Sequence, residues 1–169
     1  ANFDGLNNNI NTTYNQKIAN NTNFSLNIRL STNILSGVHF AVWKVSNAFT
    51  TSAFGIGEVN DNILGCFESL DITDYRIGFT PSIGLIYNVM CTRLGNNVSL
   101  YVNGLYNGSV ITSGTIKNSD QVSWIIGGEP TLNYWNGTIS NVLIYDRALS
   151  ASEISTLYNT SDVQFLYKE

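Results

Sequence analysis

Charged side chains are scarce in this sequence. Only 12% of its 169 residues are Asp, Glu, Lys or Arg, and the 12 acidic and 8 basic residues give a net charge of −4. A weakly acidic chain with so few basic side chains lacks the basic surface by which proteins bind nucleic acid or an anionic membrane. We therefore expect neither of these partners.

Long apolar runs, histidines and nucleophile motifs are missing too. The longest apolar stretches, residues 83–87 and 142–145, are too short to cross a bilayer, so we expect no membrane insertion. His39 is the single histidine, which excludes zinc sites built from several histidines and leaves one conceivable general base. The serine-nucleophile pattern G-x-S-x-G is absent.

Only two cysteines are present, Cys66 and Cys91, each within a strand-like segment. They could form one disulfide if the two strands are neighbours. The alternative, which we favour from the sequence, is a pair of buried thiols that pack as small hydrophobic side chains.

Polarity comes instead from Asn, Ser and Thr, and about one residue in seven is Asn. Such a surface can hydrogen-bond sugars, although an A+T-rich genome would encode the same composition. Asn-x-Ser/Thr sequons are frequent for the same reason, so they are a weak sign of glycosylation. They begin at Asn11, Asn20, Asn23, Asn97, Asn107, Asn136 and Asn159.

Short segments of alternating hydrophobicity predict many β-strands. In residues 24–30 the apolar side chains occupy every second position, which is typical of a half-buried strand. Residues 38–45 place Val38, Phe40 and Val42 on one predicted face and His39 and Trp43 on the other. A further strand, residues 98–102, leads into Asn103-Gly104, the sequence preferred for a type I′ hairpin turn. Turn signals every 8 to 12 residues indicate an antiparallel sandwich.

The stretch from Tyr134 to Asn159 is expected to organise the fold. Its first half predicts a strand in which Ile139, Leu143 and Tyr145 share one side. Its second half predicts a short helix, because Ser150 and Glu153 have the spacing of a capping box, flanked by a hydrophobic staple of Leu149 and Ile154. An isolated helix of this length is unstable in water, so its apolar stripe, Ile154, Leu157 and Tyr158, must pack on the sandwich.

Residues 135–158 resemble the C-terminal signature of laminin-G-like domains of the concanavalin A-like lectin superfamily, which includes the pentraxins. The matching features are Trp-x-Gly-x-Ile, the Tyr-Asp-Arg-Ala-Leu-Ser turn and the Glu-Ile-x-x-Leu-Tyr helix. Residues 87–104 are similar to the strand and hairpin of the same family, and Phe3-Asp4-Gly5 is a third, weaker match. The resemblance implies an all-β fold: an antiparallel two-sheet jelly-roll β-sandwich with one short C-terminal helix.

The sequence does not indicate a catalytic site. Laminarinase-type relatives place catalytic carboxylates as Glu-x-Asp-x-x-Glu along one strand, whereas this chain has Glu68, Asp71 and Asp74. Glu68 and Asp71 differ in parity, so a continuous strand would direct them to opposite faces. We expect a charged turn there and no enzyme activity.

The predicted ligand-binding residues are aromatic or adjacent to aromatic residues. If Val38, Phe40 and Val42 point inward, Trp43 and His39 point to the outer face of the sheet, where an exposed ring could stack on a sugar. The alternative is that loops cover this face. Tyr75 with Arg76, and Tyr134 beside the Glu129 loop, are weaker candidates, while Trp124 and Trp135 are expected in the core.

Calcium is the ion that the resemblance implies, held in the pentraxin pattern by a Gly-x-Glu-x-Asp loop. Here the loop at residues 127–133 keeps Glu129 but lacks the following acid, and the facing loop offers only Ser46 and Asn47. The usual Asp of the last strand is replaced by Ser140. Fewer charged ligands predict at most a weak calcium site at Glu129 and Asn47.

We therefore expect a single domain over residues 1–169, excised from a longer protein and located outside the cell or on a cell or virion surface. Its expected function is non-catalytic recognition of a glycan or a surface macromolecule, with affinity raised by multivalent display or homo-oligomer formation. The alternatives are a structural, adhesive or virion-decoration domain that binds protein and, less favoured, a polysaccharide-cleaving enzyme.

Overall fold

The computed structural model describes residues 1–12, 23–45, 52–59, 62–70, 73–113, 123–129 and 132–161. These residues form strands and one C-terminal helix. The strands are β1 (Asn2–Asp4), β2 (Ile10–Asn11), β3 (Phe24–Thr32), β4 (Val38–Val45), β5 (Ser52–Val59), β6 (Leu64–Leu70), β7 (Thr73–Phe79), β8 (Tyr87–Leu94), β9 (Asn97–Val102), β10 (Leu105–Ile111), β11 (Ile125–Ile126) and β12 (Asn136–Tyr145). The helix is α1 (Ala151–Ser161).

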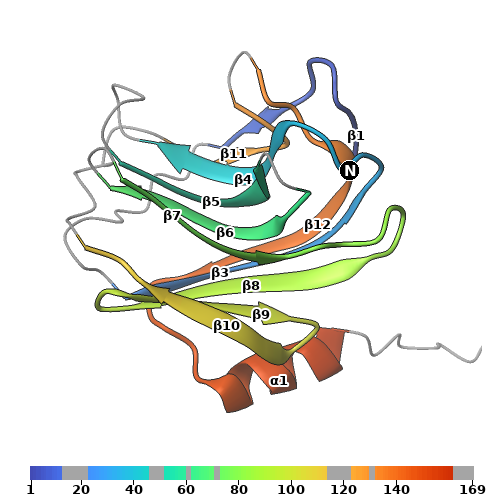
Figure 1. Cartoon of the computed structure of the whole chain (residues 1–169). Coiled ribbons are helices and arrows are strands. Elements are labelled where there is room, and N and C mark those ends of the chain that lie inside the picture. The colour runs from blue at the N-terminus through green and yellow to red at the C-terminus, as the bar shows by residue number, and fades with distance from the viewer. Residues whose placement is uncertain are drawn as a thin grey trace, which may run out of the picture.

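Two antiparallel six-stranded sheets stack face to face (Figure 1). The first sheet has the order β1-β12-β3-β8-β9-β10, and the second has the order β2-β11-β4-β5-β6-β7. Figure 1 shows α1 beneath the first sheet, on the side away from the second. The predicted jelly-roll sandwich with a short C-terminal helix is confirmed.

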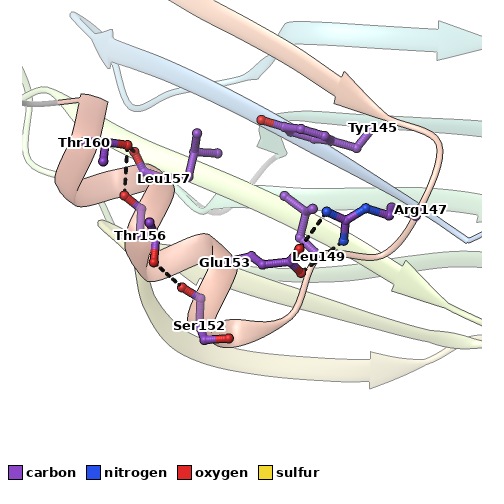
Figure 2. Close-up of a pocket in the computed structure, with 8 residues that line it drawn as sticks. All are labelled: Tyr145, Arg147, Leu149, Ser152, Glu153, Thr156, Leu157 and Thr160. Atoms are coloured by element: carbon purple, nitrogen blue, oxygen red, sulfur yellow. Dashed lines mark hydrogen bonds and ion pairs between the residues drawn. The ribbon is translucent and has the colours of Figure 1, made fainter.

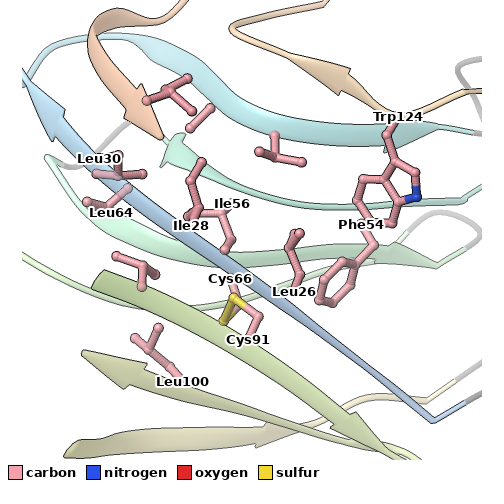
Figure 3. Packing of buried hydrophobic residues seen from close by; sticks show 14 of the residues in the cluster. Leu26, Ile28, Leu30, Phe54, Ile56, Leu64, Cys66, Cys91, Leu100 and Trp124 are labelled. Carbon is pink, nitrogen blue, oxygen red and sulfur yellow. A yellow bond between two sulfur atoms is a disulfide. The ribbon is translucent and has the colours of Figure 1, made fainter. Parts of the chain in front are cut away.

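The main core fills the space between the sheets. Leu26, Ile28 and Leu30 of β3 face Ile56 and Leu64 of the second sheet, as Figure 3 shows. Trp124 and Trp135 are also buried in this core, as predicted. Strand β3 is buried on both faces, because Ser25 and Asn27 on its other side are inaccessible too. The prediction of a half-buried strand was therefore wrong.

A disulfide joins the sheets through this core. Cys66 lies on β6 and Cys91 on β8, and their bond lies among the apolar side chains of Figure 3. The preference for two free thiols was wrong, since pairing depends on the stacking of two strands 25 residues apart in sequence.

Two β-bulges change which side chains face the core. In β4, Phe40 pairs with Gly57 but Val42 pairs with Ile56, so Ala41 is an extra residue. In β12, the register breaks between Ser140 and Leu143. Each bulge reverses the alternation of the residues that follow it. The sequence predictions of shared faces therefore fail in both strands.

The hairpin and the helix form as predicted. Asn103 and Gly104 both have positive φ, 50° and 77°, as a type I′ turn requires. Ile154 is buried against Met90 and Leu149 on the outer face of the first sheet. The helix therefore packs on the sandwich through the predicted apolar side.

The disulfide should contribute substantially to stability. Replacing both Cys66 and Cys91 with Ala should lower the free energy of unfolding by about 3 kcal/mol. The reason is that the unfolded chain loses a crosslink between two residues 25 positions apart in sequence. Urea denaturation with and without reductant measures the effect. Reductant should shift the wild-type midpoint and leave that of the double variant unchanged; equal midpoints for oxidised and reduced wild type would contradict the prediction.

Candidate binding site

Trp43 does not present an exposed ring. It is on the outer face of the second sheet, but only 6% of its surface is accessible. It forms a separate cluster with Phe40 and Phe67, whose ring centroids lie 4.0 and 5.4 Å from that of Trp43. The prediction that the Trp43 ring is exposed and can stack on a sugar is therefore wrong.

Glycines allow these rings to lie close to the backbone of the sheet. Gly55 pairs with both Trp43 and Phe67, and Gly57 pairs with Phe40. A Cβ atom at Gly57 would be only 2.9 Å from Cδ1 of Phe40, and one at Gly55 would be 3.2 Å from Cε3 of Trp43. The cluster is thus a packed structural element.

His39 is separated from Trp43 by the Ala41 bulge and is brought to Tyr134 instead. Its Nδ1 lies 2.7 Å from the carbonyl oxygen of Tyr134, and its Nε2 lies 2.8 Å from that of Ser36. The ring therefore bridges the loop before β4 and the loop before β12. His39 and Tyr134, both predicted ligand-binding residues, therefore meet here, but Tyr134 contributes its backbone carbonyl and not its ring.

Glu129 and Tyr134 both lie between β11 and β12. Its backbone oxygen accepts a hydrogen bond from Asn9, and burial raises the pKa of its carboxyl, an effect that the Asn133 side chain opposes. Asn47, the other predicted calcium ligand, is outside the described residues, as is Ser46. Within the described part of the chain, no group of three or more His, Cys, Asp or Glu residues could hold a metal ion.

Tyr75 and Arg76 point to opposite faces of β7. Tyr75 packs against the main core, and its hydroxyl bonds Ser113. The Arg76 guanidinium lies 5.6 Å from the centroid of Phe67 and pairs with Asp74 at 3.2 Å. Arg76 is therefore close to the Trp43 cluster, whereas Tyr75 is not.

The carboxylates considered for catalysis do not converge. Glu68 points into the core, where its Oε1 lies 2.8 Å from Nε of Arg93 and both side chains are buried. Burial raises the pKa of Glu68, and the charge of Arg93 opposes this shift. Asp74 is exposed, and Asp71 lies outside the described residues.

A groove opens between α1 and the end of β12. Its volume is about 370 Å³, and Figure 2 shows the side chains around it. Tyr145 and Arg147 come from the end of β12 and the following turn, whereas Leu157 comes from the helix. The described residues that line the groove are Tyr145, Arg147, Leu149, Ser152, Glu153, Thr156, Leu157 and Thr160.

The bulge in β12 places Tyr145 in this groove. Asn141 adopts a φ of 50°, in the left-handed region, where the register breaks. Beyond it, Ile144 pairs with Leu26 and packs toward the main core, while Tyr145 pairs with Ser25 and packs with the cluster under α1. The predicted common face of Ile139, Leu143 and Tyr145 is therefore wrong.

An ion pair and the capping box fix the groove's charged wall. Arg147 holds Glu153 with two hydrogen bonds, of 3.0 and 2.6 Å. Glu153 also accepts a hydrogen bond from the backbone N–H of Ser150 at 2.8 Å, as the capping box predicts. The Arg147 bonds, followed by those of Ser150, lower the pKa of Glu153 from 4.5 to about 2. Glu153 therefore stays ionised at physiological pH.

Ser25 holds the turn that carries Arg147. Its hydroxyl donates to the Arg147 carbonyl at 2.9 Å and accepts from the Leu149 N–H at 2.8 Å. From the sequence, this turn and helix were assigned only structural roles: the capping box, the hydrophobic staple and the apolar stripe. The groove was missed because its walls come from two segments whose orientation depends on the bulge.

The two-sheet jelly roll with its outer helix defines a lectin-like class of domain. A laminin G family described as the concanavalin A-like lectin/glucanases superfamily matches residues 68–155. The chain belongs to this superfamily, as the sequence resemblance predicted. No curated protein is significantly similar to the chain.

Solved structures share the fold at low sequence identity. The heptameric SAP-like pentraxin of Limulus polyphemus has a TM-score of 0.69 and 16% identity, over 93% of this chain and 80% of the pentraxin. Domain 4 of the arabinanase AbnA from Geobacillus stearothermophilus, in complex with arabinotriose, has a TM-score of 0.70 and 16% identity, over 83% and 68%. The CBM40 of a Ruminococcus gnavus sialidase, bound to α2,3-sialyllactose, has a TM-score of 0.63 and 14% identity, over 81% and 83%.

Replacing Trp43 with Ala should destabilise the domain by about 3 to 5 kcal/mol, because the change leaves a cavity beside Phe40 and Phe67. Chemical denaturation measures this loss. A Trp43→Ala variant of wild-type stability that no longer bound ligand would instead make Trp43 a ligand contact.

Glu153 should add to stability only when it is ionised. Its folded-state pKa is depressed, so this contribution is present above pH 4.5 and is lost as the pH falls through about 2. The Glu153→Gln variant should lose less stability than wild type over that range, by a small amount because the pair is exposed. Urea titrations at several pH values measure the difference.

The matched control is Glu129→Gln, because the pKa of Glu129 is raised. The Glu129→Gln variant should lose at least as much stability on acidification as wild type does. Equal acid sensitivity of wild type and Glu153→Gln would contradict the role of the ion pair.

Proposed function

We propose that this domain is a non-catalytic recognition domain that binds a glycan through the groove between α1 and β12. The observation that carries this proposal is the groove's lining: an apolar floor flanked by charged and hydroxyl side chains. A saccharide ring has an apolar face and a hydroxylated edge, so it needs both kinds of contact. A rigid sandwich behind the groove keeps these groups in place.

The charge arrangement supports recognition rather than cleavage. Glycoside hydrolysis needs two carboxylates on either side of one bond. Among the described residues that line this groove, Glu153 is the single acidic one, and its hydrogen bonds to Arg147 hold it ionised. A general acid needs the opposite shift, a raised pKa.

Solved structures of similar fold support a glycan as the ligand. Arabinotriose is bound to the AbnA domain and α2,3-sialyllactose to the CBM40 domain, on folds similar to this one. At 14 to 16% identity the likeness covers the fold, and the choice of ligand depends on this chain's own side chains.

A place outside the cell or on a surface fits the same proposal. The Cys66–Cys91 disulfide is of the kind that forms and persists in oxidising compartments. Among the residues that the structure describes, no helix is long and apolar enough to span a membrane.

One observation favours a second candidate function, a structural or adhesive domain that contacts protein. The loop between β7 and β8 exposes Ile83, Leu85 and Ile86, each at 55 to 57%. Neighbouring exposed aliphatic side chains are typical of protein contact sites. Self-association of the wild type, lost in a Leu85→Ser variant, would favour this candidate.

Replacing Tyr145 with Ala should weaken glycan binding about tenfold, because the apolar face of a sugar ring loses its aromatic contact. The measurement is a glycan array followed by titration calorimetry on the strongest ligand. Circular dichroism of the variant checks that α1 remains folded.

The matched control is Tyr106→Ala, since Tyr106 is an exposed tyrosine on β10, outside the groove. This control should bind like wild type. An array without ligands for a well-folded wild type would contradict the proposed function.

A further inference from the structure

On the helical wall of the groove, two threonine hydroxyls already donate their protons to backbone carbonyls. Thr156 Oγ1 donates to the carbonyl oxygen of Ser152 at 2.9 Å, and Thr160 Oγ1 donates to that of Thr156 at 2.9 Å, as Figure 2 shows. A hydroxyl has one proton and two acceptor lone pairs. Thr156 and Thr160 therefore offer acceptors to a ligand in the groove.

The opposite wall offers donors. An arginine side chain carries five N–H groups, and Arg147 uses two of them on Glu153. Its side chain is 56% exposed, so further N–H groups can reach a ligand. Glu153 has little acceptor capacity left, because Arg147 and the N–H and hydroxyl of Ser150 already occupy its oxygens.

The ionised groups around the groove do not favour an anionic ligand. Arg147 and Glu153 cancel each other's charge, and the low pKa of Glu153 keeps the pair intact at neutral and mildly acidic pH. Asp146, next to Arg147 in the chain, is exposed and adds a second negative charge. A carboxylate or sulfate on the ligand would therefore meet a net negative surface.

We propose that the groove binds an uncharged oligosaccharide that lies along α1, an inference that rests on the proposed glycan-binding function. Sugar hydroxyls donate to Thr156 and Thr160 and accept from Arg147, and one ring packs on Tyr145 and Leu157. Ser152, Thr156 and Thr160 are one turn apart, so the hydroxyl row extends about 12 Å and can contact more than one sugar ring.

A saccharide fits this lining better than a peptide does. A peptide bound in a groove is anchored by an apolar side chain in a deep pocket. Here Leu149 is only 7% exposed and closes the floor, so the open surface is shallow and rich in hydrogen-bonding groups. Shallow amphipathic surfaces suit sugar rings.

The experiment titrates the whole chain with neutral gluco-, galacto-, manno- and arabino-oligosaccharides and with uronate-capped and sialylated counterparts. Wild type should bind a neutral ligand more tightly than its acidic counterpart. Thr156→Val and Thr160→Val keep the side-chain shape and remove an acceptor, so each should weaken binding about fivefold. Thr80→Val, at an exposed threonine outside the groove, is the matched control and should bind like wild type.

Glu153→Gln tests the charge argument. Glutamine can still accept the Ser150 hydrogen bond of the capping box, while Arg147 loses its counter-charge. Affinity for the acidic counterparts should rise at least fivefold relative to the neutral ligands. Unchanged selectivity in this variant would overturn the inference.

The remaining outcomes separate this inference from the proposed function. Wild type that prefers acidic saccharides, or binding weakened by Tyr145→Ala but not by the threonine variants, would overturn the inference while glycan binding in the groove stands. Glycan binding unaffected by the threonine variants and by Tyr145→Ala would place the ligand elsewhere and overturn both. A well-folded protein that binds no saccharide would overturn both. Neutral-ligand binding weakened by both valine variants and unchanged by Thr80→Val would support the inference.

Discussion

The packing of α1 on the outer face of the first sheet is the interaction on which the exposed surface depends. An 11-residue helix is unstable alone, and burial of Ile154 and Leu149 against Met90 stabilises it. Because the helix covers part of that face, the strip between its outer side and the end of β12 stays open. The groove is thus a direct consequence of helix docking.

The relative position of the two sheets is fixed by adjacent links across the core. Cys66 and Glu68 are two residues apart on β6, and their partners Cys91 and Arg93 are two residues apart on β8. A one-residue shift of either strand would direct both side chains to the wrong face. The buried ion pair is costly to desolvate, but with the disulfide it permits a single alignment of the sheets.

Features set by local sequence could be predicted, and those set by distant contacts could not. The Asn103-Gly104 turn and the Ser150 capping box depend on neighbouring residues, and both form as predicted. The Cys66–Cys91 pairing depends on which strands stack, which periodicity does not reveal. The faces of Phe40 and Tyr145 were mispredicted because each strand contains a bulge, and a single extra residue reverses a period-2 pattern.

The two bulges decide which aromatic side chain lines the groove and which is packed away. In β4 the extra residue Ala41 places Phe40 and Trp43 on the same face, where they pack on each other and on glycine backbone. In β12 the register break moves Tyr145 from the core side to the side of the helix. Without the β12 bulge, Tyr145 would face the core. The groove would then lose its aromatic side chain although Tyr145 is still present in the strand. In these two strands, backbone register decides which side chains reach the outer surface as directly as side-chain identity does.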